Sequence, residues 1–151
     1  MTNKEAERAY LAAVRLLGFR ARSRKEVMDK LAEKDFDEET IRAAVVMLED
    51  ARYIDDVNYA RQFIENMSRK NYGKKMTDYR LSQKGVSRDD IAAAYAILDE
   101  LSEEDSDAQL EAATRAYEKW ARNREPDRQK AFAFLVRRGF SAGVINKILA
   151  F

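Results

Sequence analysis

Leu81-Ser-Gln-Lys84-Gly85-Val86-Ser87-Arg-Asp-Asp-Ile91 is one of three segments that align with one another without a gap. The first of the three is Leu31-Ala-Glu-Lys34-Asp35-Phe36-Asp37-Glu-Glu-Thr-Ile41, and the third is Leu135-Val-Arg-Arg138-Gly139-Phe140-Ser141-Ala-Gly-Val-Ile145. The offsets between them are 50 and 54 residues. Self-similarity at such a period predicts a repeat architecture, which decides how the rest of the sequence is interpreted.

Each position of the aligned segments has a physical role between two helices. The leading leucine is expected in the core, and the cation three residues later suits the negative end of a helix dipole. The next residue ends the helix in a left-handed conformation, which glycine adopts cheaply and aspartate less well. These stop positions are Asp35, Gly85 and Gly139. The N-caps of the following helix are Asp37, Ser87 and Ser141. Residues suited to hydrophobic staples around these caps are Phe36/Ile41, Val86/Ile91 and Phe140/Ile145.

The similarity extends upstream, so each repeat contains three helices. Eight residues before each leucine stands a permitted N-cap, namely Ser23, Gly73 and Asp127, and Ser23 forms a capping box with Glu26. The preceding helices carry the apolar stripes Tyr10/Val14/Leu17, Ala60/Ile64/Met67 and Ala113/Tyr117/Trp120. Helices are predicted over 4–18, 23–34, 38–53, 56–70, 74–84, 88–101, 103–122, 127–138 and 142–150. No segment alternates with period two, so no sheet is expected.

The predicted fold class is therefore all-α, with three tandem three-helix repeats over residues 1–54, 55–101 and 102–151. A unit of roughly 50 residues is marginal as an independent fold, so neighbouring repeats are expected to pack on each other. We expect an extended, curved array of nine helices and a monomer, because no coiled-coil seam is evident.

Composition narrows the classes of function. The 151 residues include no Cys and no His, which removes disulfides, thiol chemistry, the usual zinc and haem ligands and the commonest general base. The sequence also lacks a P-loop and the Gly-x-Ser-x-Gly turn of many hydrolases. A non-catalytic protein without cofactor or metal is expected. The N-terminus does not resemble a signal peptide and no apolar run is long enough to span a membrane, so we expect a cytoplasmic protein without membrane contact.

The repeats resemble the RecX family, whose members regulate the RecA recombinase. The resemblance covers essentially the whole chain. It is carried by Tyr53-Ile54-Asp55-Asp56 with Tyr59, Ala60 and Phe63, by Tyr72-Gly73, and by the second and third aligned segments. Asp35 departs from the glycine that is usual at its position. The resemblance implies a negative regulator that lies in the groove of the RecA–DNA filament, blocks extension and promotes disassembly. It thereby implies a role in recombination, DNA repair and the SOS response.

Basic residues near the middle helices are the candidate partner-binding sites. Although the net charge is only +1, cations gather in the first turn of each middle helix, where they oppose the helix dipole. An acidic or phosphorylated partner would explain them, and so would descent of the three repeats from one ancestor by duplication. The candidates, with the preceding loops, are Arg20, Arg22, Arg24, Lys25, Arg69, Lys70, Tyr72, Lys74, Lys75, Arg122, Arg124 and Arg128. Tyr72 either stacks on a base or makes a local apolar contact, whereas Trp120 and Phe134 are expected in the core.

Two other readings stay open at this point. Short turns such as Lys84-Gly85-Val86-Ser87 also fit an independent DNA-binding module of helix-turn-helix type, and weak direct contact with DNA is compatible with either reading. The near-neutral charge argues against strong intrinsic affinity for DNA. A plain helical adaptor for an unrelated protein would instead require an exposed apolar patch of several hundred Å², on the order of the largest patches of soluble proteins.

Overall fold

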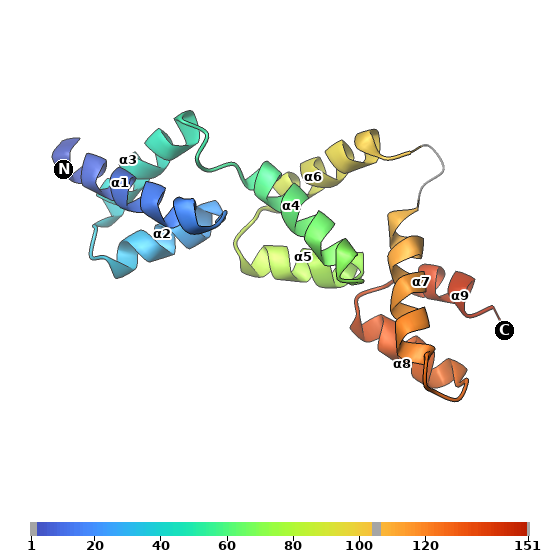
Figure 1. The fold of residues 1–151 in the computed structure, drawn as a ribbon. Coiled ribbons are helices and arrows are strands. Elements are labelled where there is room, and N and C mark those ends of the chain that lie inside the picture. The colour runs from blue at the N-terminus through green and yellow to red at the C-terminus, as the bar shows by residue number, and fades with distance from the viewer. Residues whose placement is uncertain (1–2, 104–106, 151) are drawn as a thin grey trace. The chain divides into compact units, whose positions relative to one another are not determined.

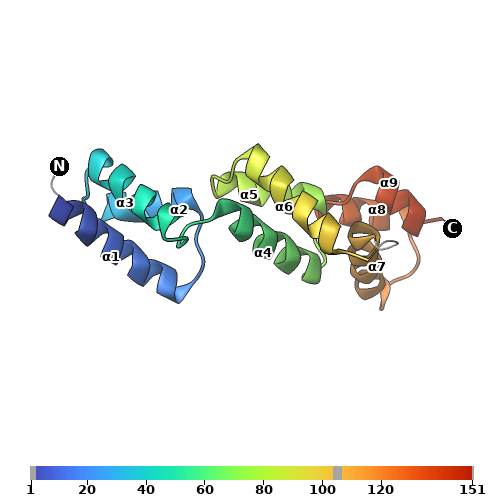
Figure 2. The ribbon, with the colours of Figure 1, turned by 90° about the horizontal axis from the view of Figure 1, so that it is seen from above.

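The computed structural model describes residues 3–103 and 107–150, and these residues form nine α-helices and no strand (Figures 1 and 2). The helices are α1 Asn3–Phe19, α2 Arg24–Glu33, α3 Glu38–Asp50, α4 Asp56–Arg69, α5 Lys74–Gln83, α6 Arg88–Leu101, α7 Ala108–Ala121, α8 Arg128–Arg137 and α9 Ala142–Ile148. The prediction of an all-α chain is confirmed. The curvature of the array and the repeat boundaries stay predictions.

Packing groups the chain into two compact units. The first unit comprises Met1–Ala60 and Ser82–Ala94, and the second comprises Arg61–Leu81 and Tyr95–Phe151. The helices of the middle repeat are thus divided between the units.

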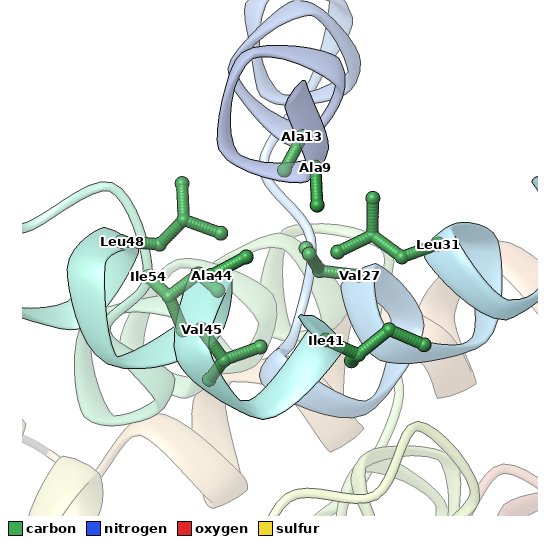
Figure 3. Packing of buried hydrophobic residues seen from close by; sticks show 9 residues of the cluster. All are labelled: Ala9, Ala13, Val27, Leu31, Ile41, Ala44, Val45, Leu48 and Ile54. Atoms are coloured by element: carbon green, nitrogen blue, oxygen red, sulfur yellow. The ribbon is translucent and has the colours of Figure 1, made fainter. Parts of the chain in front are cut away.

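In the first unit, α1, α2 and α3 surround one apolar cluster (Figure 3). Small residues of α1, Ala9 and Ala13, are fully buried and face Val27 and Leu31 of α2. The larger side chains of the predicted stripe, Tyr10, Val14 and Leu17, lie at the edge of this cluster and are only partly buried. The α1 face that points into the core is therefore centred on alanines, which let helices approach closely, and not on the bulkiest residues.

The second unit contains an equivalent cluster between α7, α8 and α9. It is formed by Ala112, Ala113, Ala116, Ala131, Leu135, Phe140, Ile145 and Leu149. Alanines again supply the buried face of the first helix. Leu135 and Phe140, from the third aligned segment, are almost completely buried, as predicted for the leading leucine and the staple residue. Full burial of one such side chain contributes about 1.5–3 kcal/mol to the free energy of folding. The residues that define the repeat therefore also stabilise the fold.

The predicted turns are confirmed at all three stop positions. Asp35 has φ 67°, Gly85 has φ 80° and Gly139 has φ 98°. The side chains of Asp37 and Ser141 accept hydrogen bonds from the amides of Thr40 and Val144, at 2.8 and 3.3 Å. Asp35 thus holds a left-handed conformation that costs a residue with a Cβ more than it costs glycine. It is exposed, and among the described residues no side chain is bonded to it.

Two helix boundaries differ from the prediction by three residues or more. The helix expected from residue 103 begins at Ala108, because the side chain of Asp107 caps it by accepting from the amide of Leu110 at 3.0 Å. The helix expected to reach residue 53 ends at Asp50. There Arg52 takes φ 62°, a left-handed stop that the sequence does not mark with a glycine.

Candidate functional site

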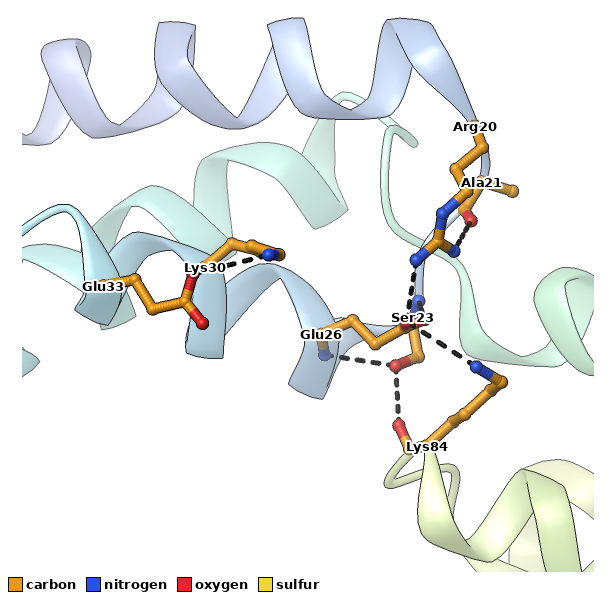
Figure 4. A network of polar contacts seen from close by, with 7 residues as sticks. All are labelled: Arg20, Ala21, Ser23, Glu26, Lys30, Glu33 and Lys84. Atoms are coloured by element: carbon orange, nitrogen blue, oxygen red, sulfur yellow. Dashed lines mark hydrogen bonds and ion pairs between the residues drawn. The ribbon is translucent and has the colours of Figure 1, made fainter.

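In the first unit, the start of α2 is joined to the turn that follows α5 (Figure 4). Ser23 is completely buried and caps α2, and its hydroxyl accepts from the amide of Glu26 at 3.2 Å. The same hydroxyl donates to the carbonyl oxygen of Lys84 at 2.6 Å. The Glu26 carboxylate accepts from the amide of Ser23 at 3.1 Å, which completes the predicted capping box. The Ser23 side chain therefore both caps α2 and links the first repeat to the second by a hydrogen bond.

Two further contacts define this first junction. The amide of Arg24 donates to the carboxylate of Asp56, the first residue of α4, at 2.8 Å. A Cβ added at Gly85 would lie 2.3 Å from Cδ of Lys25 and 2.5 Å from its Cβ. Glycine is therefore required at position 85 for two reasons. The turn there is left-handed, and the aliphatic part of the Lys25 side chain lies against the backbone of Gly85.

The second unit repeats the arrangement between α5 and the turn after α8. The amide of Gly73 donates to the carbonyl of Arg138 at 2.8 Å, and the amide of Lys75 donates to the carbonyl of Gly139 at 3.0 Å. A Cβ at Gly73 would lie 2.4 Å from the carbonyl group of Gly139. The amide of Lys74 donates to the side chain of Gln109 at 2.8 Å, as that of Arg24 does to Asp56. Gly73 takes the predicted N-cap position, since its carbonyl accepts from the amide of Thr77 at 3.1 Å, and the third repeat supplies the acceptors for the first amides of α5.

Charges strengthen the first junction around Glu26. Arg20 lies 3.2 Å and Lys84 3.8 Å from its carboxylate. Burial raises the pKa of Glu26, but the hydrogen bond from the Ser23 amide, together with Arg20 and Lys84, outweighs burial and holds this pKa below its usual value. The ionised form is therefore favoured in the folded protein.

Glu26→Gln is expected to lower the free energy of unfolding at neutral pH by about 0.5–1 kcal/mol, because glutamine keeps the capping oxygen but loses the charge. A depressed folded-state pKa gives stability that is present above the unfolded-state pKa and is lost as the pH falls. The difference between variant and wild type should therefore shrink in acid. Urea denaturation at a series of pH values measures it, and a difference that does not vary with pH would contradict the charge argument.

The predicted binding residues of the first unit all lie at this junction, and most have partners within the chain. Arg20 bonds to Glu26, and Arg24 forms an ion pair with Glu49 at 3.4 Å. Lys25 pairs with Asp29, four residues later on α2, at 2.9 Å. Arg22 is partly buried and its Nε has no hydrogen-bond partner among the described residues. Internal carboxylates thus account for the cations that the helix dipole disfavours.

The candidates around the α4–α5 turn differ in how they are held. Lys74 pairs with Asp78 at 2.7 Å, and its ammonium lies 4.5 Å from the ring centre of Tyr95. Arg69 bonds to the side chain of Asn66. The Lys70 and Lys75 side chains are exposed and have no ion pair among the described residues. The two exposed lysines are consequently the cations of this turn that remain available to a partner.

Tyr72 lies between two guanidinium groups, an arrangement that neither sequence interpretation foresaw. The guanidinium carbon of Arg138 lies 3.8 Å from its ring centre and that of Arg80 lies 4.7 Å away. The hydrogen bond with Arg80 and the charge of Arg138 lower the pKa of the Tyr72 hydroxyl. Arg138 also donates to the carbonyl oxygens of Asn71, at 3.2 Å, and Lys70. It thereby stabilises the end of α4, whereas the sequence predicted that it would serve its own helix.

The candidates after α7 are spread over two environments. Arg124 lies with its guanidinium carbon 4.8 Å from the ring centre of Trp120. Arg128 donates to the carbonyl of Leu149 and to the side chain of Asn146, both at 3.2 Å, and so fastens α8 to α9. Arg122 is exposed, and among the described residues its side chain has no bonded partner. Arg128 is therefore chiefly structural, and Arg122 and Arg124 remain candidates.

The burial of two aromatic residues near these cations was predicted wrongly from the sequence, and one arginine was not singled out. Trp120 and Phe134 were expected in the core, but both are only partly buried and stack with ring centres 5.4 Å apart. Arg115 was not singled out, yet it donates to Asn71 at 2.8 Å and to the carbonyl of Ser68 at 3.1 Å. Arg115 and Arg138, which come from α7 and the end of α8, together hold the end of α4. Such long-range pairs leave no periodic signal.

Every helix within residues 3–103 and 107–150 is too short or too polar to cross a lipid bilayer. Profiles of the first, second and third three-helix domains of RecX match residues 9–48, 55–94 and 103–149. Two proteins named "Regulatory protein RecX", from Chlorobium phaeobacteroides (strain BS1) and Prosthecochloris aestuarii (strain DSM 271 / SK 413), are each 36% identical to this chain. Both alignments cover 99% of this chain and 96% of the relative.

A solved structure agrees with the sequence comparison. The crystal structure of RecX from Lactobacillus salivarius superimposes with a TM-score of 0.84 at 28% identity, over 99% of this chain and 97% of the other. Three domain matches, relatives of nearly equal length and a common fold therefore converge, and the chain belongs to the RecX family of non-enzymatic regulatory proteins.

Proposed function

We propose that this protein is a negative regulator of the RecA recombinase, which binds in the groove of the RecA–DNA filament, blocks its extension and promotes its disassembly. The observation that carries the proposal is the match to all three RecX domains in order along nearly the whole chain. Membership of the family supports a cytoplasmic protein that acts as a monomer on recombination, DNA repair and the SOS response.

The proposal assigns the contact with the filament to the basic residues that folding leaves available. These are Lys70, Lys75, Arg122 and Arg124 in the second unit, with Arg22 in the first. Internal partners hold the remaining basic candidates, which would position the surface more than contact a ligand: Arg20, Arg24, Lys25, Arg69, Lys74 and Arg128. Tyr72 would keep Arg138 and Arg80 in place. Electrostatic contacts of this kind favour an acidic protein surface or DNA phosphates.

A charge reversal at Lys75 tests this assignment. Its backbone amide is bonded to Gly139, but its side chain is exposed and unpaired among the described residues, so Lys75→Glu should fold normally. The variant should need a several-fold higher concentration than wild type to inhibit the DNA-dependent ATPase of a RecA filament. Lys147→Glu on α9 carries the same change of charge on another exposed lysine and should inhibit like wild type.

The outcome that contradicts the assignment is equal inhibition by wild type and Lys75→Glu, with both shown to be folded. Tight, steeply salt-dependent binding to bare duplex DNA without any effect on RecA would instead favour the independent helix-turn-helix module.

A further inference from the structure

Six planar side chains follow one another across the second unit. Arg80 and Arg138 enclose Tyr72, and the guanidinium carbon of Arg138 also lies 6.0 Å from the ring centre of Phe134. Phe134 is stacked on Trp120 with an angle of 19° between the rings, and Arg124 covers Trp120. In order, the series is Arg80, Tyr72, Arg138, Phe134, Trp120 and Arg124. A row of cations and aromatic rings of this kind favours further flat groups that carry negative charge.

A cavity of about 260 Å³ opens beside the middle of this series. Its apolar wall is formed by Ala116, Trp120 and Phe134, and three cations, Lys70, Lys119 and Arg138, also line it. Among its described lining residues there is no carboxylate. The combination offers an aromatic surface to a small planar group and positive charge to an anion attached to that group.

Other cavities of the molecule carry more acidic groups in their lining. One of about 400 Å³ in the first unit is lined by two arginines, Arg24 and Arg52, and by four carboxylates, Glu49, Asp55, Asp56 and Asp90. The cavity beside Tyr95 is bordered by Lys74, Asp99 and Asp107, and the one on the other side of Trp120 by Arg124, Lys130, Glu125 and Asp127. None of these three has the excess of positive charge that lines the cavity beside Phe134, so charge favours that cavity for a polyanion.

Arg138 is already ordered before any ligand arrives. Its Nε and one terminal nitrogen donate to the carbonyls of Asn71 and Lys70, and Tyr72 supports its flat face. A cation fixed in this way loses little conformational freedom on binding, which increases affinity. Lys70 follows α4 and Lys119 lies in α7. Both are exposed and have no ion pair among the described residues. They can adjust to the positions of the phosphates.

We propose that this cavity holds one unpaired base of a single-stranded nucleic acid, in contact with the Trp120 and Phe134 side chains that line it, while Lys70, Lys119 and Arg138 bind the adjoining phosphates. An acidic peptide would use the cations but would leave the aromatic wall without a matching flat group, so a nucleotide unit uses more of the site. The inference rests on the proposed function for its biological setting and names the chemistry that one part of that surface recognises.

The single tryptophan of the chain makes the site directly observable. Oligothymidylate, added to the isolated protein, should quench the fluorescence of Trp120 saturably, because a base in the cavity contacts the indole that lines it. An abasic strand of equal length carries the same phosphates and should bind about ten-fold more weakly, with less quenching. Equal responses to both strands, no response to either, or a stronger response to polyglutamate than to the strand would overturn the proposal.

A matched pair of variants checks the position of the site. Lys119→Glu should weaken binding of oligothymidylate by about ten-fold, since it places a negative charge inside the cavity. Lys147→Glu changes the net charge equally on α9 and does not line the cavity, so it should bind nearly like wild type. Equal losses for the two variants would mean that only net charge matters, which also overturns the site. No RecA is present, so failure here leaves the inhibition of RecA to be judged by its own assay.

Discussion

Gly139→Ala is expected to destabilise the second unit by roughly 3 kcal/mol, the sum of backbone strain and steric overlap. Gly139 has φ 98°, which a residue with a Cβ adopts only at a cost. The added Cβ would also lie 2.5 Å from the amide nitrogen of Met76 and 2.6 Å from its Cβ. Relief requires the α8–α9 turn to move away from α5, which breaks the hydrogen bonds of Gly73 and Lys75 at this junction.

Urea denaturation followed by the fluorescence of Trp120 measures this loss, because that residue lies in the second unit. Gly143→Ala is the matched control. Gly143 lies inside α9, and a Cβ added there meets no atom closer than 4.0 Å, so alanine should be neutral or stabilise by about 0.5–1 kcal/mol. If Gly139→Ala were as stable as wild type, the close backbone approach at this junction would be wrong.

Leu81→Ala is expected to cost about 2–5 kcal/mol of unfolding free energy, the range for a leucine removed from a well-packed interior. Leu81 is the leading leucine of the second aligned segment and has no exposed surface. The change leaves a cavity in addition to removing apolar contacts, and the helix itself tolerates alanine well. The loss should appear in thermal or urea unfolding followed by circular dichroism.

Leu11→Ala is the control that distinguishes the effect of losing a buried side chain from the effect of replacing any leucine. Leu11 lies in α1 and is 57% exposed, so its removal should change stability by less than about 0.5 kcal/mol. A loss below about 1 kcal/mol for Leu81→Ala would show that the buried faces of the helices are misassigned.

The helices and their turns could be predicted because the information they need is local. An N-cap side chain such as that of Ser23 bonds to an amide only three residues later. The left-handed stops at Asp35, Gly85 and Gly139 follow directly from the aligned segments. The internal partners of the first-turn cations were also open to prediction. Lys25 with Asp29 and Lys74 with Asp78 stand four residues apart, the spacing of neighbours on a helix surface.

The contacts between repeats could not be predicted from the same pattern. Gly73 fits an N-cap in sequence, but its actual constraint is the backbone of Gly139, 66 positions further along the chain. Arg138 is the C-cap of its own helix, yet its side chain bonds to carbonyls at the end of α4. Periodicity records which residues share a helix face and carries no information about which distant backbone that face meets.

The burial of Trp120 was predicted wrongly for a related reason. Trp120 is in phase with a buried stripe, so the pattern places it in the interior. Its helix instead buries Ala112, Ala113 and Ala116 at the centre, and the large ring is displaced to the rim beside Phe134. This displacement creates the aromatic wall on which the proposed nucleotide site depends. An aromatic residue at the margin of an alanine-centred face was the available signal.

The most direct test of the central claim is the DNA-dependent ATPase activity of a RecA filament, measured while wild-type protein is added in sub-stoichiometric amounts. If the protein blocks filament extension and promotes disassembly, the activity should fall progressively well before one molecule is present for each RecA protomer. Unchanged activity at equimolar protein, with its helical circular dichroism intact, would contradict the claim that this chain regulates RecA.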